Sequence, residues 1–232
     1  MIVPRGCVSA SVLVVVVSAV APVAAVADEG VALPPPAAPQ PPAGCQATLH
    51  AAGVKLSRWP LRPEKRLGGV VCEAPEGIAV QRGASGIRYQ PAARVNCAFG
   101  LRLVKFEAVV QEEAKRILGS RVRTIVQLGT YNCRKMAAYP DLVSEHSFAN
   151  AIDVAELVLA NGRRVVVERD WPRQDGPSAA FLHRLARRLY DEQVFSVVLT
   201  PAYDRHHHNH LHLDGAAYSV DGTGGAGRLP PG

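Results

Sequence analysis

The proline-rich segment 31–44 sets the limits of what this chain can fold into. Its sequence, VALPPPAAPQPPAG, favours an extended spacer with little capacity to pack. The last eleven residues, GTGGAGRLPPG, are typical of a mobile tail. We therefore expect a linker over 28–44, one folded domain over 45–215 and a flexible tail over 216–232. A substantial core is possible, because 48% of the residues are hydrophobic.

The segment before the linker has the features of a secretory signal peptide. A positively charged start precedes an almost wholly apolar run over 8–20, and the sequence AVA at 25–27 forms a cleavage signal before Asp28. An uncleaved membrane anchor is the alternative, but a spanning helix needs roughly 20 apolar residues. We expect residues 1–27 to be removed, which leaves no stable membrane span and a periplasmic or secreted protein.

The net charge of the mature chain limits which classes of partner we expect. Cleavage leaves 25 basic and 20 acidic residues, a formal charge of +5. Outside the cytoplasm, a basic surface favours anionic partners such as the cell-wall polymer or lipid headgroups, with simple solubility as the alternative. Arg184, Arg187 and Arg188 have helix-face spacing, without the interleaved aromatic residues of a nucleic-acid stripe. The sequence therefore argues against nucleic-acid binding.

Four cysteines remain after cleavage: Cys45, Cys72, Cys97 and Cys133. An even number in an exported protein favours two disulfides, and the sequence leaves all three connectivities open. Their wide spacing, without a CxxC pair, argues against a structural zinc ribbon. We expect all four to be bridged.

Hydrophobic periodicity predicts an α+β domain with a mainly antiparallel sheet flanked by helices. Asn161-Gly162 between two apolar runs is a strong hairpin signal, and Gly119 stops a helical repeat where a C-cap is expected. The expected elements are a helix ending near Gly119, a strand over about 121–129, a hairpin of 151–159 and 163–168, a helix over 177–191, and strands near 195–199 and 210–213.

Histidines concentrate near the end of the expected domain. Five of the eight lie between 206 and 212. If 210–213 is a strand, His210 and His212 project from the same face, because strand side chains alternate. His146 and Asp153 bracket the entry to the hairpin strand and can reach the same point. Alone, each histidine is more simply a hydrogen-bonded polar residue. Together, two histidines and a carboxylate leave one open position on a tetrahedral zinc, as a catalytic site requires.

These residues also carry a family resemblance. SEHSFANAIDV (144–154) resembles the SxHxxGxAxD motif of the zinc peptidases that include D-alanyl-D-alanine carboxypeptidases, murein endopeptidases and the Hedgehog signalling domain, and HLH (210–212) resembles their HxH. GTYNCR (129–134) and VLTPAYDRHHHNHLHLD (198–214) are similar to the bacterial extensin-like C-terminal domain of the same superfamily. The resemblance implies a Hedgehog/DD-peptidase-like fold.

The resemblance assigns roles to individual residues. It implies three zinc ligands: His146, Asp153 and His212. His210 becomes a catalytic or transition-state-stabilising partner. Asn209 occupies the place of the glutamate base in carboxypeptidases with an ExxH motif. A histidine must therefore take that role, first His210 and then His207, because the extensin-like pattern has a histidine five residues before its final ligand.

Other positions leave alternatives open. Arg134 either binds the carboxylate of a peptide substrate or forms a surface ion pair. Asp214 either orients the last ligand or belongs to a turn. Ala149 replaces the usual glycine of the motif, a small change that permits close packing. Extensin-like domains tend to carry a cysteine near Glu192, and its absence leaves the partner of Cys133 open.

We therefore expect an exported, zinc-dependent hydrolase of peptide bonds in peptidoglycan stems or cross-links. Zinc would polarise the scissile carbonyl and lower the pKa of bound water. A non-catalytic cell-wall-binding domain with a structural zinc site is the main alternative, and a periplasmic metal buffer is a second. The sequence leaves open the bond cut, carboxypeptidase or endopeptidase action, and the oligomeric state.

Overall fold

A computed structural model describes residues 37–66, 70–137 and 139–224. The expected signal peptide lies outside these residues, as do most of the linker and the end of the tail. The elements are α1 (Cys45–Ala51), β1 (Lys55–Arg58), β2 (Glu64–Arg66), β3 (Val70–Cys72), β4 (Ile78–Arg82), β5 (Arg88–Val95), α2 (Cys97–Leu118), β6 (Val122–Gly129), η2 (Glu145–Phe148), β7 (Ala151–Leu159), β8 (Arg164–Val166), α3 (Val167–Asp170), α4 (Pro177–Asp191), β9 (Val197–Leu199), η3 (Arg205–His207), β10 (Leu211–Asp214) and β11 (Val220–Gly222).

A mixed sheet organises the described part of the chain. Its strand order is β1-β4-β5-β6-β7-β10-β9-β11, with β8 paired to β7. The pairs β5–β6 and β9–β11 are parallel, and the other pairs of this sheet are antiparallel. A separate antiparallel ribbon joins β2 to β3. The expected α+β class with a mainly antiparallel sheet is confirmed.

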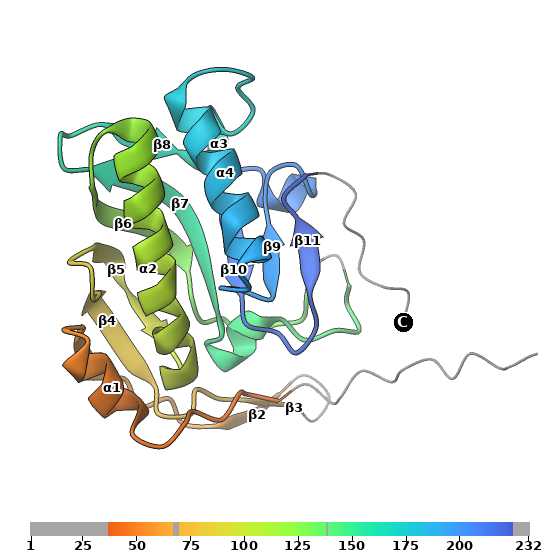
Figure 1. Ribbon diagram of the computed structural model, residues 1–232. Coiled ribbons are helices and arrows are strands. Elements are labelled where there is room, and N and C mark those ends of the chain that lie inside the picture. Colours follow the sequence, from red (N-terminus) through yellow and green to blue (C-terminus); the bar gives the residue numbers. More distant parts are fainter. Residues whose placement is uncertain (1–36, 67–69, 138, 225–232) are drawn as a thin grey trace, which may run out of the picture. The chain divides into compact units, whose positions relative to one another are not determined.

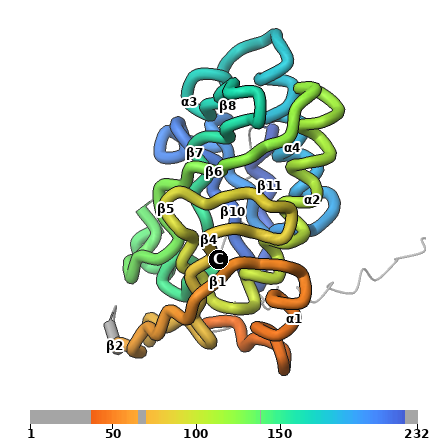
Figure 2. Tube along the Cα trace, turned by 90° about the vertical axis from the view of Figure 1, so that its left-hand side faces the viewer, coloured from red at the N-terminus to blue at the C-terminus, as the bar shows by residue number. Residues whose placement is uncertain are grey.

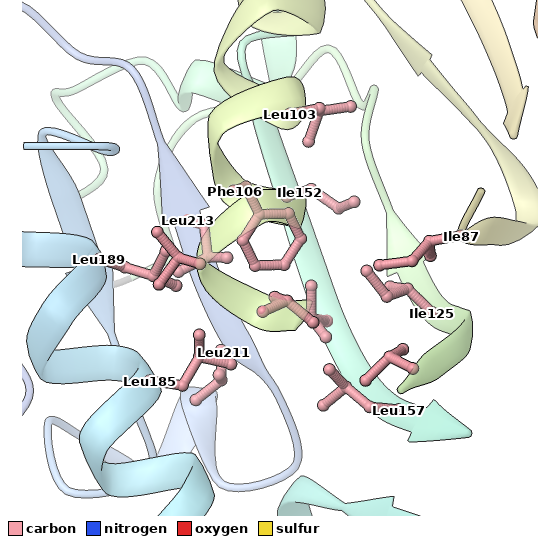
Figure 3. Close-up of a cluster of buried hydrophobic side chains, with 14 of the residues drawn as sticks. Ile87, Leu103, Phe106, Ile125, Ile152, Leu157, Leu185, Leu189, Leu211 and Leu213 are labelled. Carbon is pink, nitrogen blue, oxygen red and sulfur yellow. The ribbon is translucent and has the colours of Figure 1, made fainter. Parts of the chain in front are cut away.

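Helices α2 and α4 cover one face of this sheet (Figures 1 and 2). Figure 3 shows Phe106 of α2 and Leu185 of α4 between the helices and the strands, among side chains such as Ile152 and Leu213. All four are fully buried, at 0% exposure. The removal of such apolar surface from water is the main force that holds helices and sheet together.

The ends of α2 follow from local sequence. The side chain of Asn96 accepts a hydrogen bond from the backbone N–H of Phe99 at 2.7 Å, an N-cap that starts the helix before its apolar repeat. At the other end, Gly119 has a left-handed φ of 65°, as predicted for a C-cap.

Other predicted elements are present, with bounds that differ by one or two residues at β8, β9 and β10. Helix α4 has the predicted bounds, and the hairpin turns at Asn161 and Gly162, where φ of the glycine is 87°. The second hairpin strand ends at Val166 instead of residue 168. The chain turns there into α3, because the carboxylate of Asp170 accepts a hydrogen bond from Val166 N at 2.9 Å.

The packed domain extends past both expected limits. β11 joins the sheet beside β9, and Val220 packs with Val197 and Ala216. The prediction that the flexible tail begins at residue 216 is therefore wrong, because the chain completes the sheet through residue 222. At the other end, Ala38 of the expected linker is 5% exposed and packs near Phe148.

Two disulfides connect separate elements. Cys45–Cys97 joins α1 to the start of α2, and Cys72–Cys133 joins the end of β3 to the loop after β6. The prediction that all four cysteines are bridged is confirmed. Such bonds are typical of secreted or extracellular proteins. Within the described ranges, the model contains no helix that is both long and apolar enough to cross a membrane.

Candidate metal centre

Two neighbouring strands present the first part of the site. Asp153 of β7 and His212 of β10 are direct partners in the antiparallel register. Leu211 and Leu213 point toward the helices (Figure 3), and Ile152 belongs to the same core. Because strand side chains alternate, Asp153 and His212 project from the opposite side of the sheet, which we call the open face.

His146 reaches the same point from η2. The hydroxyl of Ser144 accepts a hydrogen bond from His146 N at 3.4 Å and caps this short helix. The helix ends at Ala149, whose φ is 50°. A left-handed conformation favours glycine at this position, since alanine adopts it at a cost of about 1 kcal/mol.

The three predicted ligands converge. His146 Nε2 lies 3.2 Å from Asp153 Oδ2 and 3.2 Å from His212 Nδ1, and His212 Nδ1 lies 3.0 Å from Asp153 Oδ1. Nitrogen ligands about 2.0–2.1 Å from a tetrahedral zinc are about 3.3 Å apart. One donor atom from each of the three residues lies within 4.8 Å of the other two, so this group can hold a metal ion.

Charge and burial oppose each other at these ligands. Burial raises the pKa of Asp153, but His146 and His212 outweigh it and hold that pKa well below its usual range. Burial lowers the pKa of His212, but its hydrogen bonds to Asp153 and Asp214 outweigh burial and raise the pKa to about 10. Without a metal, the site is therefore an anionic carboxylate beside a protonated imidazole.

Asp214 performs both of the roles considered for it. Its Oδ2 lies 2.9 Å from His212 Nε2, so it can orient the ring whose Nδ1 faces the other ligands. Its Oδ1 accepts a hydrogen bond from Ala216 N at 3.0 Å, which is turn chemistry. A single carboxylate thus fixes both the ligand and the exit from β10.

The two candidate catalytic histidines lie beside the ligands. His210 precedes β10, which starts at Leu211, so the predicted strand was one residue too long at this end. Its Nε2 lies 3.5 Å from Asp153 Oδ1. His207 lies in η3, with its ring centroid 5.7 Å from that of His212. The site therefore brings both histidines to the metal centre, although His210 is not part of the strand.

Each of these histidines has a fixed partner. His207 Nδ1 lies 2.7 Å from Asp204 Oδ1, and His210 Nδ1 lies 2.8 Å from Asn209 Oδ1. Burial lowers the pKa of His207, and it lowers the pKa of His210 to about 4. Both rings are therefore neutral near pH 7 and able to accept a proton.

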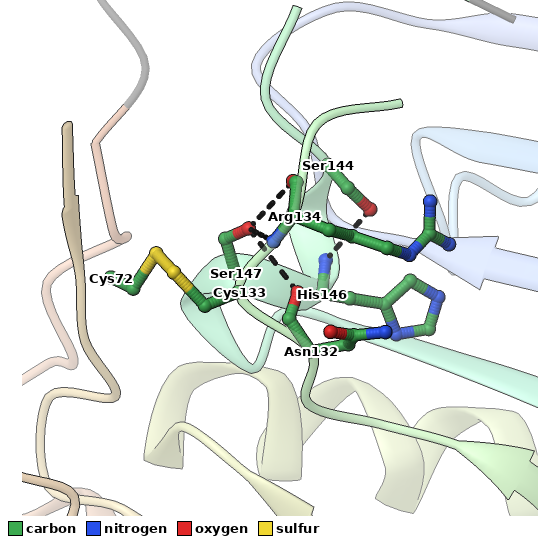
Figure 4. Close-up of a disulfide and its surroundings, with 7 residues drawn as sticks. All are labelled: Cys72, Asn132, Cys133, Arg134, Ser144, His146 and Ser147. Carbon is green, nitrogen blue, oxygen red and sulfur yellow. Dashed lines mark hydrogen bonds between the residues drawn. A yellow bond between two sulfur atoms is a disulfide. The ribbon is translucent and has the colours of Figure 1, made fainter. Parts of the chain in front are cut away.

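Arg134 lies on the loop that the Cys72–Cys133 disulfide anchors (Figure 4). The hydroxyl of Ser147 accepts a hydrogen bond from Arg134 N at 3.0 Å, which joins this loop to the His146 segment. The guanidinium and the His146 ring extend to the same side in Figure 4. Its Nη1 donates to Lys135 O at 3.3 Å, and no carboxylate of the described residues pairs with it.

A cleft connects these groups. It is lined by the loop with Arg134 and Tyr139, by Glu145, Asp153 and His212, and by Tyr203, the histidine loop and Tyr218. Sequence reasoning missed Glu145, whose pKa is raised to about 7 by burial and then by Asp214. It also missed Asp204. Neither residue belongs to a sequence motif that would identify it as part of the site, although Asp204 lies directly before the histidine-rich run.

Fold and site together define an α+β domain with a candidate His-Asp-His metal centre on the open face of its sheet. The chain belongs to the family described as extensin-like protein C-terminus, whose pattern matches residues 43–223. That match covers the sheet from β1 to β11, which agrees with the extended domain limits. No curated protein and no solved structure matches the chain.

Proposed function

We propose that this protein is an exported zinc metallopeptidase that hydrolyses peptide bonds of peptidoglycan stems or cross-links. The observation that carries the proposal is the convergence of His146, Asp153 and His212: the two imidazole nitrogens lie 3.2 Å apart, and each lies 3.0–3.2 Å from one of the two carboxylate oxygens of Asp153. They belong to the motifs that resemble the zinc peptidases. When bound, zinc supplies a Lewis acid and a water of lowered pKa.

The residues around the centre supply the remaining functions. Arg134 offers a guanidinium that can hold a substrate carboxylate through two parallel hydrogen bonds. With Nδ1 of His207 held by Asp204, its Nε2 is the ring atom left to accept a proton. His210 is the second candidate for this step, since its Nε2 lies beside Asp153. Either histidine can replace the glutamate whose place Asn209 takes.

Digestion of purified sacculi tests this function. Zinc-loaded protein should release muropeptides that mass spectrometry identifies, and a chelator should stop the release. Binding to sacculi without release would favour the non-catalytic cell-wall-binding domain with a structural zinc site. Several weakly bound zinc ions per chain that do not depend on Asp153 would favour the metal buffer instead.

A further inference from the structure

A second group of side chains lies on the open face, away from the cleft. Ala93 and Val95 of β5 belong to the core, so Arg94 between them projects to the open face. Its guanidinium carbon lies 6.0 Å from the centre of the Trp59 ring, and that ring contacts Tyr131 edge to face at 5.3 Å. We call Trp59, Arg94 and Tyr131 the aromatic–arginine shelf.

The shelf is connected to the metal centre through the backbone. Thr130 Oγ1 accepts a hydrogen bond from Arg94 N at 3.1 Å, and Asn132 N donates to His146 O at 3.1 Å. Gly129, two residues before Tyr131, is the register partner of Asp153. Since adjacent strands are about 4.8 Å apart, β5 lies roughly 10 Å from β7, the length of about three extended residues.

Strand order places the shelf and the cleft on different sides of the ligands. Asp153 and His212 belong to β7 and β10, in the middle of the path from β1 to β11. The shelf belongs to the β1–β5–β6 side, whereas Leu199 and Val220 of the cleft belong to β9 and β11. A chain that crosses the metal centre can therefore contact both.

The charge of the shelf indicates what it binds. Several described arginines, such as Arg58 and Arg123, form no ion pair with another described residue, whereas seven pair with carboxylates: Arg116, Arg164, Arg169, Arg173, Arg184, Arg187 and Arg188. Arg94 is exposed and, over the ranges that the structure covers, has no such partner. Arg134 in the cleft also has no carboxylate partner among the described residues. Two guanidinium groups without carboxylates thus lie near the centre, Arg94 on the shelf and Arg134 in the cleft, which suits an anionic chain.

We propose that the shelf is the second half of a substrate groove and binds a carboxylate-bearing peptide segment on the side of the metal centre opposite the β9–β11 part of the cleft. The site is then built for an internal peptide bond of a cross-linked, anionic peptide, and its action is that of an endopeptidase. This inference rests on the proposed peptidase function, but it concerns binding and can be tested separately.

The test compares Arg94→Gln with Arg88→Gln. Arg88 lies at the other end of the same strand, is exposed, and lacks an ion pair among the described residues, so it is the control for the loss of a positive charge on β5. The probes are a cross-linked muropeptide dimer and a short tripeptide ending in D-alanyl-D-alanine, titrated calorimetrically into zinc-loaded protein with a His210→Ala background. Arg94→Gln should weaken dimer binding about 10-fold, leave tripeptide binding unchanged, and differ from the Arg88 variant.

Four outcomes decide the matter. Equal losses in both arginine variants, or no loss in Arg94→Gln, overturn the shelf. Equal competition by peptide-free glycan strands overturns the peptide assignment. A loss specific to Arg94, together with no muropeptide hydrolysis by the protein that retains His210, supports the shelf and rejects the peptidase. If the protein that retains His210 hydrolyses the dimer and Arg94→Gln binds the dimer normally, the result supports the peptidase and rejects the shelf. Trp59→Leu should reproduce the defect, because the ring positions the guanidinium.

Discussion

The carboxylate of Asp153 lies within 3.5 Å of three imidazole nitrogens, from His146, His210 and His212. Its pKa is held well below the usual range, so it is ionised at neutral pH despite its burial. Within the proposed ligand set it is the one anion, which compensates part of the charge of a divalent ion. Its removal therefore leaves two imidazoles to bind the metal alone.

Asp153→Ala should consequently lose most of the bound zinc, from about one ion per chain. Elemental analysis of the purified protein measures the content, and circular dichroism confirms that the variant is folded. Asp204→Asn serves as the control, since this carboxylate contacts His207 and not a proposed ligand. Full zinc stoichiometry in Asp153→Ala would show that the ligand set is incorrect.

Zinc binding should release about one proton near neutral pH. The pKa of His212 is about 10 in the metal-free site, whereas a ligand imidazole must be neutral. Zinc affinity should thus rise about tenfold per pH unit below that pKa. Calorimetric titrations in two buffers of different ionisation enthalpy count the protons. A count of zero at pH 7 contradicts the protonated state of His212.

Substitution of the two proposed catalytic histidines should separate turnover from metal binding. His210→Ala should keep its zinc and lose on the order of 10²-fold or more in turnover, the range of general acid–base catalysis, with a similar or smaller defect in His207→Ala. Zinc content and muropeptide release are measured for each variant. Zinc loss in His210→Ala makes it a ligand, and full activity in both variants rejects a histidine base.

At the scale of elements, α2 is attached to the β4–β5 turn through one buried carboxylate. Glu107 accepts hydrogen bonds from Ser85 N and Ser85 Oγ at 2.8 Å and from the Tyr89 hydroxyl at 2.9 Å. Burial raises the pKa of Glu107, which the bonds from Ser85 and Tyr89 oppose. This contact is tight, because a Cβ at Gly83 would lie 1.4 Å from Glu107 Oε1.

Gly83→Ala should therefore destabilise the domain by about 1–3 kcal/mol, since the added methyl group displaces Glu107 from its donors. Urea unfolding followed by circular dichroism gives the change in the free energy of unfolding. Gly224→Ala is the matched control, because a Cβ there meets no atom within 4 Å. Equal stability of the two variants would mean that the turn relaxes without cost.

At the scale of the whole molecule, the two disulfides close long loops but serve different regions. The bridged residues are 52 and 61 positions apart. Loops of this length give each bond a chain-entropy stabilisation of roughly 4 kcal/mol. Cys45–Cys97 lies between two helices, whereas Cys72–Cys133 holds the residue next to Arg134 (Figure 4). Their stability effects should be similar and their functional effects different.

Replacement of each pair by serine tests this distinction. Both double variants should lose a few kcal/mol in the free energy of unfolding. At a temperature where both remain folded, only Cys72→Ser/Cys133→Ser should raise KM for the muropeptide dimer, because the Arg134 loop is released. The Cys45→Ser/Cys97→Ser variant is the control. An equal rise in KM for both would assign the effect to general destabilisation.

Local patterns predicted the elements that local interactions form. The bounds of α4, the C-cap at Gly119 and the Asn161-Gly162 turn all depend on residues a few positions apart, and sequence spacing records those directly. Spacing also selected the three ligands, because their motifs are short. By contrast, polar and apolar residues alternate only weakly in β1 to β5. These strands were not predicted, because they depend on pairing with one another, as β1 does with β4 and β4 with β5.

Tertiary structure decided the other contacts between distant segments. The sequence left three disulfide connectivities open, and only the fold brings Cys72 beside Cys133. The same holds for β11, which was expected to be tail and completes the sheet beside β9. The position of Arg94 against Trp59 also arises in space, from residues 35 positions apart. The physical reason is that such contacts depend on how strands pair and pack, which sequence spacing does not record.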